Sequence, residues 1–186
     1  MRVDVDRDTG LVVRLAEQAD LDAARQVMRR VLEEDLGGYR AEWHRDVDDP
    51  GTAYLDRPDA ALFVARRDGL VVGTAAVRPC HLRTPPNPGW LVERYSRPGV
   101  CELRRVWVVR EARRLGVAGA LTRAAARWAV GPGGYDTVYF HTDTSVPGAE
   151  AFWRAMPTEQ VHDARPDPWN CVHFVLDVTR LLDGEP

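Results

Sequence analysis

The sequence predicts an α/β protein built around a mixed sheet, and three observations support this. Some short segments are apolar throughout or alternate with period two, as β-strands do. Others repeat apolar residues every three or four positions, as amphipathic helices do. The two kinds of segment alternate along a chain of 186 residues, which is long enough to bury one core. We therefore expect residues 1–186 to form a single α/β domain with helices flanking the sheet.

The N-terminal region is predicted to hold a strand and a helix. Residues 11–16 alternate weakly and suit a strand. Asp20 is placed to N-cap a helix whose apolar positions recur over residues 21–32. The glycine pair at 37–38 is expected to end that helix, because glycine readily adopts the left-handed backbone of a helix terminus.

A hairpin and two irregular segments come next. Residues 61–65 and 70–77 are apolar strands on either side of the Asp-Gly pair at 68–69, which is typical of a tight hairpin turn. Residues 39–58, before the hairpin, are polar, aromatic and rich in turn formers. Residues 78–99, after it, are proline-rich and too long for an ordinary hairpin loop. Their length favours a substrate lid or a recognition loop.

The C-terminal half alternates strands with helices. Residues 101–109 form an apolar strand that leads into a glycine-containing turn, and residues 117–130 have the apolar spacing of a helix. The Gly-Pro-Gly-Gly run at 131–134 is expected to end that helix. Further elements are expected as strands at 136–142 and 171–178 and as a short helix at 149–156.

Charge and hydropathy argue against two classes of function. The chain has 25 basic and 28 acidic residues and a net charge of -3, so it lacks the basic surface of a general nucleic-acid-binding protein. No apolar run reaches the roughly 18 residues of a membrane span, and no signal-peptide core follows Met1. We therefore expect a cytoplasmic protein that binds neither nucleic acid nor membrane.

The three cysteines do not form a recognisable metal or disulfide motif. Cys80, Cys101 and Cys171 are isolated in the sequence and lack Cys-x-x-Cys spacing. We expect them to be small buried apolar residues, with no metal bound. Cys101 has no identified histidine partner, so it is a poor candidate for a covalent nucleophile.

The most informative stretch is a strand that stops at Val109 and a turn, residues 113–119, that opens a helix. The first amides of a helix have no intrahelical acceptor, and the helix dipole adds partial positive charge at that end. Gly116, Ala118 and Gly119 let the backbone approach a ligand closely because they carry no large side chain. The turn therefore predicts a site for a phosphate or pyrophosphate.

The Arg-x-x-Gly-x-Ala spacing of residues 113–118 resembles the acyl-CoA pyrophosphate loop of the GNAT N-acetyltransferases. The order of elements over residues 11–178 also resembles their fold. The resemblance implies a mixed central sheet in which two splayed parallel strands, 101–109 and 136–142, hold the pantetheine arm of acetyl-CoA as co-substrate. It implies CoA contacts from the backbone of Val106, Trp107 and Val108 and from the amides of Arg113, Arg114, Gly116, Ala118 and Gly119.

The resemblance also implies catalytic residues. Glu102 stands where histone-type members carry their general base, and desolvation on an apolar strand suits a base that works near neutral pH. His141, near the end of the second splayed strand, is expected to relay protons because histidine titrates near neutrality, and Asp143 is placed to orient it. Both residues also have a structural interpretation, in which Glu102 pairs with Arg104 or Arg105 and His141 packs in the strand.

The chain departs from the family at two positions. Residues 149–153 match the common Ala-x-x-Phe-Tyr helix, except that Trp153 replaces a tyrosine that often donates a proton to the CoA thiolate. An indole N–H is not a useful acid, so we expect Trp153 to pack on the pantetheine arm. Val146 replaces a frequent asparagine that contacts CoA. The proton then comes from water, from Tyr139 or from Ser145, or is not needed.

Residues 39–58 and 78–99 are candidate recognition surfaces for the acceptor. Trp43 and His44 lie where members of the family often contact the acceptor, which implies a substrate-binding role for both. Nearby acids would attract a cationic amine, although a solvated acidic loop is the alternative. These acids are Glu42, Asp46, Asp48 and Asp49. We expect a primary amine of a small molecule as acceptor, with a protein N-terminus or lysine as the alternative.

Together these features predict an acyl-CoA-dependent N-acyltransferase that moves an acetyl group by direct attack in a ternary complex. The alternative is a catalytically silent member of the family that binds acyl-CoA as a sensor or an assembly module. Members of the family often dimerise through their C-terminal strands, so residues 171–178 are the expected contact of a homodimer.

Overall fold

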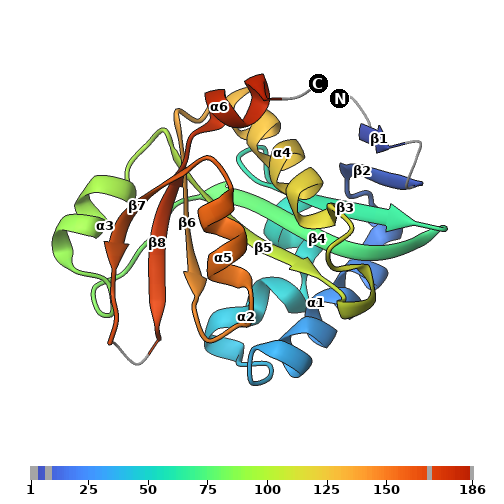
Figure 1. The fold of residues 1–186 in the computed structure, drawn as a ribbon, viewed down its shortest axis with the longest axis horizontal. Helices are drawn as coiled ribbons and strands as arrows, with labels where there is room; N and C mark the ends of the chain where they lie inside the picture. Colours follow the sequence, from blue (N-terminus) through green and yellow to red (C-terminus); the bar gives the residue numbers. More distant parts are fainter. Residues whose placement is uncertain (1–3, 7–9, 167–168, 185–186) are drawn as a thin grey trace. The chain divides into compact units, whose positions relative to one another are not determined.

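The computed structural model describes residues 4–6, 10–166 and 169–184 (Figure 1). The chain falls into two compact units. The first unit comprises residues 1–77 and 105–125, and the second comprises residues 78–104 and 126–186. Strands β4 (Leu70–Pro79) and β5 (Val100–Val108) and helix α4 (Val117–Val130) contribute residues to both units. Each unit has strands, helices and a core of its own.

The first unit begins with an antiparallel ladder. Strands β1 (Asp4–Asp6), β2 (Leu11–Leu15), β3 (Ala61–Arg67) and β4 pair in this order. The turn between β3 and β4 has positive φ at both central residues, 51° at Asp68 and 80° at Gly69, as a primed hairpin turn requires. The hairpin predicted from the Asp-Gly pair is therefore confirmed.

Helices cover both faces of this ladder. On one face, α1 (Leu21–Asp35), α2 (Ala41–Asp48) and η2 (Gly51–Leu55) pack on β3 and β4. On the other face α4 lies so close to Gly73 that a Cβ there would meet Leu121 at 3.1 Å and Val117 at 3.2 Å. The core under α1 consists of apolar side chains from helices, strands and the residues next to them: Ala16, Leu21, Ala24, Met28, Leu32, Val47, Tyr54, Ala60, Leu62, Val64 and Ala76.

Two short helical segments precede α1 and α4 in the first unit. Segment η1 (Gln18–Asp20) leads into α1, and η3 (Arg110–Ala112) follows β5. Helix α4 has the predicted bounds, and α1 begins directly after Asp20 as expected. The sequence did not predict helices in residues 39–58, because α2 and η2 are short and α2 is kinked at His44.

The second unit combines parallel and antiparallel pairing. Strand β5 runs parallel to β6 (Thr137–Asp143), and β8 (Cys171–Leu176) runs antiparallel both to β6 and to β7 (Thr158–Asp163). The predicted mixed sheet is thus confirmed. The strand Thr158–Asp163 was not predicted, because its partly exposed sequence lacks a clear apolar alternation.

The parallel pairing of β5 with β6 is short. Residues of β5 pair with β6 only over Val100–Glu102 and Thr137–Tyr139, although both strands continue beyond this stretch. This limited register agrees with the expected splayed pair.

Strand β8 is internal to the sheet. Because β8 has a partner on each edge, it has no edge left to pair with a second copy, contrary to the expectation for residues 171–178. A homodimer formed in another way stays a prediction.

The proline-rich segment after β4 holds a helix that packs into the second core. Helix α3 (Gly89–Tyr95) buries Leu91 and Tyr95, and the Tyr95 ring stacks on Tyr139 with centroids 4.9 Å apart. Helices α5 (Ala149–Ala155) and α6 (Val178–Asp183) complete the unit, and α5 contacts β6 and β7 (Figure 1). A segment anchored by α3 differs from the wholly irregular loop that the prolines suggested.

A buried ion-pair cluster fixes the start of α1. The Asp20 side chain, only 2% exposed, accepts hydrogen bonds from Arg14 at 2.6 and 3.0 Å and from Arg66 at 2.8 Å. It also accepts from the Glu17 amide at 2.9 Å. Asp20 therefore joins β2, β3 and α1 through its carboxylate, and it does not cap α1 with its side chain as the sequence suggested.

Replacing Asp20 should destabilise the protein strongly. We expect Asp20→Ala to lower the free energy of unfolding by about 3 kcal/mol, because two partly buried guanidiniums lose their counter-ion. Urea denaturation measures this loss. Asp22→Ala, next to it on α1 with a side chain 88% exposed, is the control and should change stability by less than about 0.5 kcal/mol. Equal effects of the two substitutions would contradict the role given to Asp20.

Candidate active site

The predicted phosphate turn is formed in the first unit. After β5 the chain passes through η3, and the backbone then takes positive φ at Arg114 (62°) and Gly116 (75°) before α4 begins. The Ala120 amide donates to the Gly116 carbonyl at 3.0 Å. Amides that come before this first helical bond have no acceptor within the helix. They lie at the positively polarised end of a helix of 14 residues, which suits an anion.

The turn has room for a ligand beside its glycines. A Cβ built on Gly116 would meet no atom within 4 Å, and one on Gly119 would meet only the Arg123 guanidinium, at 3.4 Å or more. No neighbouring protein atom therefore explains the absence of a side chain at Gly116. The positive φ is by itself a reason for glycine, and the open space leaves room for a ligand against the backbone.

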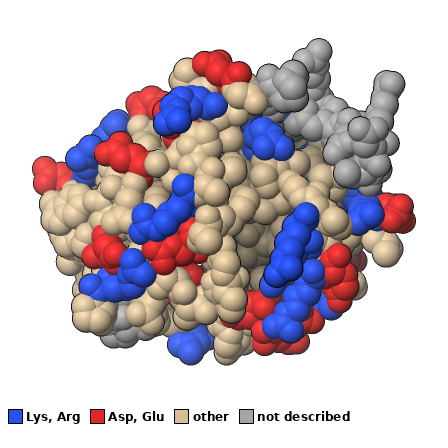
Figure 2. Space-filling view, in the orientation of Figure 1, with Lys and Arg blue, Asp and Glu red and all other residues tan. Residues whose placement is uncertain are grey.

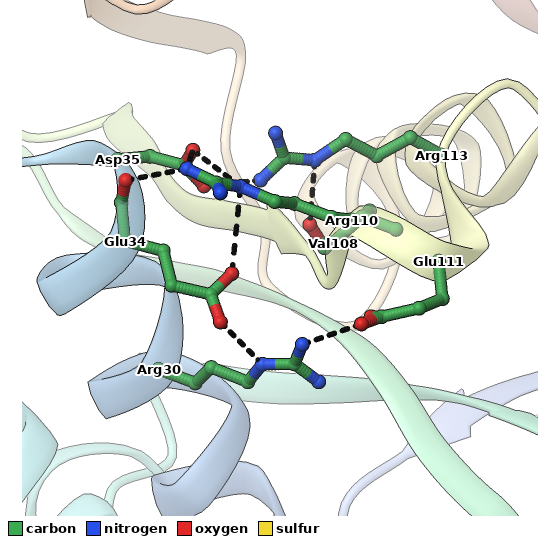
Figure 3. A network of polar contacts seen from close by, with 7 residues as sticks. All are labelled: Arg30, Glu34, Asp35, Val108, Arg110, Glu111 and Arg113. Atoms are coloured by element: carbon green, nitrogen blue, oxygen red, sulfur yellow. Dashed lines mark hydrogen bonds and ion pairs between the residues drawn. The ribbon is translucent and has the colours of Figure 1, made fainter.

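Arg113 is held within the protein by both its backbone and its side chain. Its amide donates to the Arg110 carbonyl at 3.2 Å. Its guanidinium forms an ion pair with Asp35, and its Nε donates to the Val108 carbonyl at 3.0 Å (Figure 3). The expected CoA contact through the Arg113 amide is therefore not available, because that amide is already bonded.

The second unit holds Glu102 in a cluster of cationic groups. The Glu102 side chain is 7% exposed, and its Oε2 lies 3.2 Å from Arg78 Nη2 and 3.4 Å from Arg104 Nη1. Its other oxygen, Oε1, lies 3.7 Å from His141 Nδ1. The structure thus brings together Glu102 and His141, the two predicted catalytic residues. The pairing with Arg104 that the sequence allowed is also present, and Arg78 is a partner that the sequence did not reveal.

A row of histidines continues from His141 across the sheet. In the cross-strand register His141 lies opposite His173, and His173 lies opposite His162, so all three share one face. The His141 side chain is 43% exposed, whereas His173 is buried. The Tyr139 hydroxyl and His173 Nδ1 are 2.5 Å apart. Burial, with His141 and His162 nearby, lowers the pKa of His173 to about 3, so its ring is neutral at physiological pH.

Residues proposed as helpers of His141 or as proton donors have other partners. Asp143 accepts hydrogen bonds from the Ser145 amide at 2.8 Å and hydroxyl at 2.6 Å, so it forms a turn after β6, and Glu102 is the carboxylate near His141. Tyr139 is fully buried, and burial raises the pKa of its phenol far above the physiological range. Trp153 is a buried core residue whose ring lies 4.3 Å from Phe140 between centroids.

The expected acceptor residues lie on α2 in the first unit. His44 is buried, and its Nδ1 accepts the Arg40 amide at 2.8 Å, which gives it a structural role at the start of α2. Trp43 is 41% exposed, and the Arg40 guanidinium lies over its ring at 4.8 Å. Trp43 is therefore the more accessible of the two, and its carbonyl accepts a hydrogen bond from Arg105 at 2.7 Å.

Three of the acids near α2 are engaged within the protein. Asp46 forms a buried ion pair with Arg105 at 2.7 Å, Asp48 pairs with Arg29 at 2.6 Å, and Asp49 accepts the Thr52 amide at 3.1 Å. Their charges are thus compensated or bonded, which favours the structural interpretation over attraction of a cationic acceptor. Figure 2 likewise shows basic and acidic side chains interspersed on the face that it presents.

Two of the three cysteines, Cys80 and Cys101, are buried as expected, whereas Cys171 is only half-buried, contrary to the expectation. Burial raises the pKa of the Cys101 thiol to about 12, and it raises the pKa of Cys80 further. Within the described residues, no group of three or more His, Cys, Asp or Glu side chains is arranged to hold a metal ion. Over the same residues, no helix has the length and apolar character needed to cross a membrane.

Comparison with known proteins identifies the family. The sequence model of the acetyltransferase (GNAT) family matches residues 28–156, more than half of the 186-residue chain. The protein therefore belongs to the GNAT acetyltransferase family, as the turn and the order of elements predicted. This family in general uses acetyl-CoA as co-substrate. No sequence among the curated proteins matches the chain.

Solved structures share the fold at low sequence identity. An acetyltransferase from Staphylococcus aureus Mu50 aligns with a TM-score of 0.69 and 11% identity, over 90% of this chain and 99% of its own. A GCN5-related N-acetyltransferase from Kribbella flavida aligns with a TM-score of 0.63 and 21% identity, over 91% and 98%. An N-acyl amino acid synthase from uncultured soil microbes aligns with a TM-score of 0.64 and 16% identity, over 93% of each chain. Likeness at these identities shows the fold alone.

Three residues that the sequence did not reveal lie beside predicted site residues. Asp35 pairs with Arg113 in the first unit, and in the second unit Arg78 lies beside Glu102 and His173 lies opposite His141. For Asp35 a signal was present, because α1 ends on Glu33, Glu34 and Asp35, and acids at a helix C-terminus oppose its dipole unless basic partners compensate them. For His173 and Arg78 the sequence held no signal. Strand pairing brings His173 close to His141 and Arg78 close to Glu102.

The buried His173 should make stability depend on pH. Its folded-state pKa of about 3 lies below the ordinary value of about 6.5, so the unfolded chain binds the proton more readily. Stability should therefore be complete above pH 6.5 and fall as the pH drops toward 3, by up to about 1.4 kcal/mol per pH unit. Urea denaturation of His173→Gln, which keeps an acceptor for Tyr139, should show a flatter pH profile than wild type. His81→Gln, at an exposed histidine, should leave the profile unchanged, and a wild-type profile for His173→Gln would contradict the assignment.

Gly116→Ala should weaken CoA binding beyond its effect on stability. Gly134 also has positive φ, 67°, and no atom within 4 Å of a built Cβ, so Gly134→Ala is a control with the same backbone strain. Both variants should lose about 1–2 kcal/mol of stability. Thermal unfolding with and without CoA should show that only Gly116→Ala loses the stabilisation by CoA. Equal stabilisation of both variants by CoA would contradict a phosphate site at this turn.

Proposed function

We propose that this protein is an acyl-CoA-dependent N-acyltransferase that transfers an acetyl group from acetyl-CoA to a primary amine of a small molecule. The observation that carries the proposal is the turn between β5 and α4, with its open side at Gly116 and its helix amides. Membership of the GNAT family agrees with it. A cytoplasmic location remains part of the proposal.

The phosphates of acetyl-CoA would be bound mainly by backbone. Gly116, Ala118 and Gly119 precede the first helical hydrogen bond, and Arg114 has the positive φ that turns the chain into α4. Backbone N–H groups at a helix start are fixed donors, so binding needs no reorganisation of flexible side chains. The backbone of Val106–Val108 is the proposed contact of the pantetheine arm.

Proton removal from the amine is assigned to the pair His141 and Glu102. Glu102 is buried and its Oε2 already faces two guanidiniums, which stabilise its anionic form. His141 is the more exposed member of the pair, and its Nδ1 faces Glu102 Oε1. In this arrangement His141 accepts the proton, while Glu102 orients the ring and stabilises the imidazolium. This refines the sequence-based hypothesis, in which Glu102 itself was the base.

The proposed reaction is a single displacement at the thioester. The amine nitrogen forms a bond to the acetyl carbonyl carbon, the carbon–sulfur bond breaks, and CoA leaves as a thiolate. One proton of the amine passes to His141 Nε2 and then to solvent, and the thiolate takes a proton from water. Trp153 is buried, with 7% exposure, and its indole N–H does not donate a proton in this reaction.

Direct attack is favoured over a covalent acyl-enzyme. Cys80 and Cys101 are buried, and burial raises the pKa of both thiols, so neither supplies a thiolate near neutral pH. A ternary complex of enzyme, acetyl-CoA and amine therefore fits these residues better than a two-step transfer.

A catalytically silent acyl-CoA-binding protein is the second candidate. It is favoured by Trp153, which replaces the usual tyrosine and is packed in the core. It is also favoured by the two guanidiniums that already engage Oε2 of Glu102. Thiol release from acetyl-CoA against a panel of amines separates the candidates. Release with one class of amine supports the enzyme, and CoA binding without release supports the silent protein.

Substitutions in the pair should lower turnover without weakening CoA binding. We expect His141→Gln and Glu102→Gln each to lower kcat by about 100-fold, because general-base catalysis contributes factors of this size. The double variant should be little worse than either single one, because the two residues act as a unit. Glu93→Gln, at an exposed glutamate of α3, is the matched control and should keep wild-type kcat.

The relative losses of kcat in His141→Gln and Glu102→Gln test the role of each residue. If Glu102 accepted the proton directly, His141→Gln would retain near-wild-type turnover while Glu102→Gln lost it. Additive effects would show that the two residues do not act together. Calorimetric titration with CoA should give the wild-type affinity for all three variants of the pair.

A further inference from the structure

We infer that Asp35 and Arg113 are positioning residues that hold the turn between β5 and α4 in its binding shape, and that the Arg113 side chain is not a phosphate ligand. The inference rests on the proposed binding of acetyl-CoA at this turn. It reassigns Arg113, the first residue of the Arg-x-x-Gly-x-Ala pattern, from a ligand contact to an internal brace.

Asp35 is a buried carboxylate shared by two arginines. Its side chain is 6% exposed at the last position of α1, and it forms ion pairs with Arg113 and, at 2.8 Å, with Arg110 (Figure 3). Arg110 also donates to the Glu34 carbonyl at 2.6 Å, which is one of the final carbonyls of the helix. The end of α1 is therefore bound to Arg110, before Ala112, and to Arg113, after it.

Arg113 joins two segments through one planar group. Its Nε donates to the Val108 carbonyl at 3.0 Å, where β5 ends, while its Nη2 is bound by Asp35. A guanidinium holds two acceptors in fixed directions, which a lysine ammonium on a flexible stem does not. The contact with Val108 is important because the backbone of Val106–Val108 is the proposed contact for pantetheine.

The charges of this network are balanced before any ligand binds. Besides the Asp35 pairs, Arg30 pairs with Glu34 at 2.7 Å and with Glu111 at 2.5 Å. Three arginines thus face three acids, as Figure 3 shows. The charge of Arg113 is already compensated by a buried partner, so it adds little to the attraction of a phosphate.

The location of the acids explains why the network is needed. Glu33, Glu34 and Asp35 occupy the last turn of α1, where the helix dipole disfavours negative charge. That turn holds no basic residue, and Arg30, one turn earlier, pairs with Glu34 but not with Asp35. Arg110 and Arg113, which lie between β5 and α4, supply positive charge to the end of α1. Burial alone would raise the pKa of Asp35, but hydrogen bonds from the two arginines outweigh it and leave the pKa below its ordinary value.

A ligand role and a positioning role for Arg113 predict opposite effects of Asp35→Asn. If Arg113 bound phosphate, removing the charge of Asp35 would release its guanidinium and strengthen CoA binding. If Arg113 is a brace, the turn loses its shape and CoA binding weakens. We expect the affinity for CoA, measured by calorimetric titration, to fall by about tenfold or more, because loss of preorganisation has effects of this order.

Arg113→Lys gives a second and independent test. It keeps the positive charge but cannot hold Asp35 and the Val108 carbonyl together, so we expect it to weaken CoA binding as Asp35→Asn does. In steady-state assays KM for acetyl-CoA should rise while kcat at saturation and KM for the amine stay unchanged. A merely destabilised fold would lower the active fraction, and hence kcat, without this selective change.

The control is Asp22→Asn, which removes an exposed carboxylate from the same helix and should leave CoA affinity unchanged. Unchanged or stronger CoA binding by Asp35→Asn and Arg113→Lys would overturn the inference. If wild-type protein bound no CoA at all, the proposed function would fail and this inference with it. If wild-type protein bound CoA without turnover, the binding measurements would still decide the role of Arg113.

Discussion

Three buried carboxylates of this protein each form ion pairs with two arginines, and these pairs hold neighbouring parts of the fold together. Asp20 lies between Arg14 and Arg66, Asp35 between Arg110 and Arg113, and Glu102 between Arg78 and Arg104. A buried carboxylate is costly unless it is paired and hydrogen-bonded, and the planar guanidinium satisfies both needs. The chain has no lysine, so arginine makes every such pair. Except for Glu102 and Arg104, which share β5, the partners of each pair lie on different elements.

The same interaction serves different ends at the three positions. At Asp20 it joins two strands to the start of α1, and at Asp35 it joins the end of α1 to the proposed phosphate turn. At Glu102 it places two guanidiniums beside one carboxylate oxygen, where they favour the charged form. In the proposed reaction His141, the more exposed group, takes the role that the sequence gave to Glu102.

Local patterns predicted most of the fold and one part of the site. The Asp-Gly hairpin, helix α4 and strand β6 appear within a residue or two of their predicted bounds, because periodicity and turn chemistry act over a few neighbouring residues. The short elements α2, α3 and β7 were missed, since they are fixed by tertiary contacts such as the packing of Tyr95 on Tyr139. The role of Asp143 was wrong for a related reason, as its carboxylate turns to Ser145 within the same loop.

By itself the sequence determined the strand, turn and helix around residues 106–130, and with them the family and the proposed phosphate site. These features are encoded locally, by an apolar strand, by glycine at a positive φ, and by a helix start. Only the tertiary structure decided which groups surround Glu102 and Arg113. Arg113 meets Asp35 across 78 positions of the chain, and Glu102 meets Arg78 across 24. Such pairs depend on strand register and helix packing, because side chains so distant in sequence are brought together only when the whole unit folds.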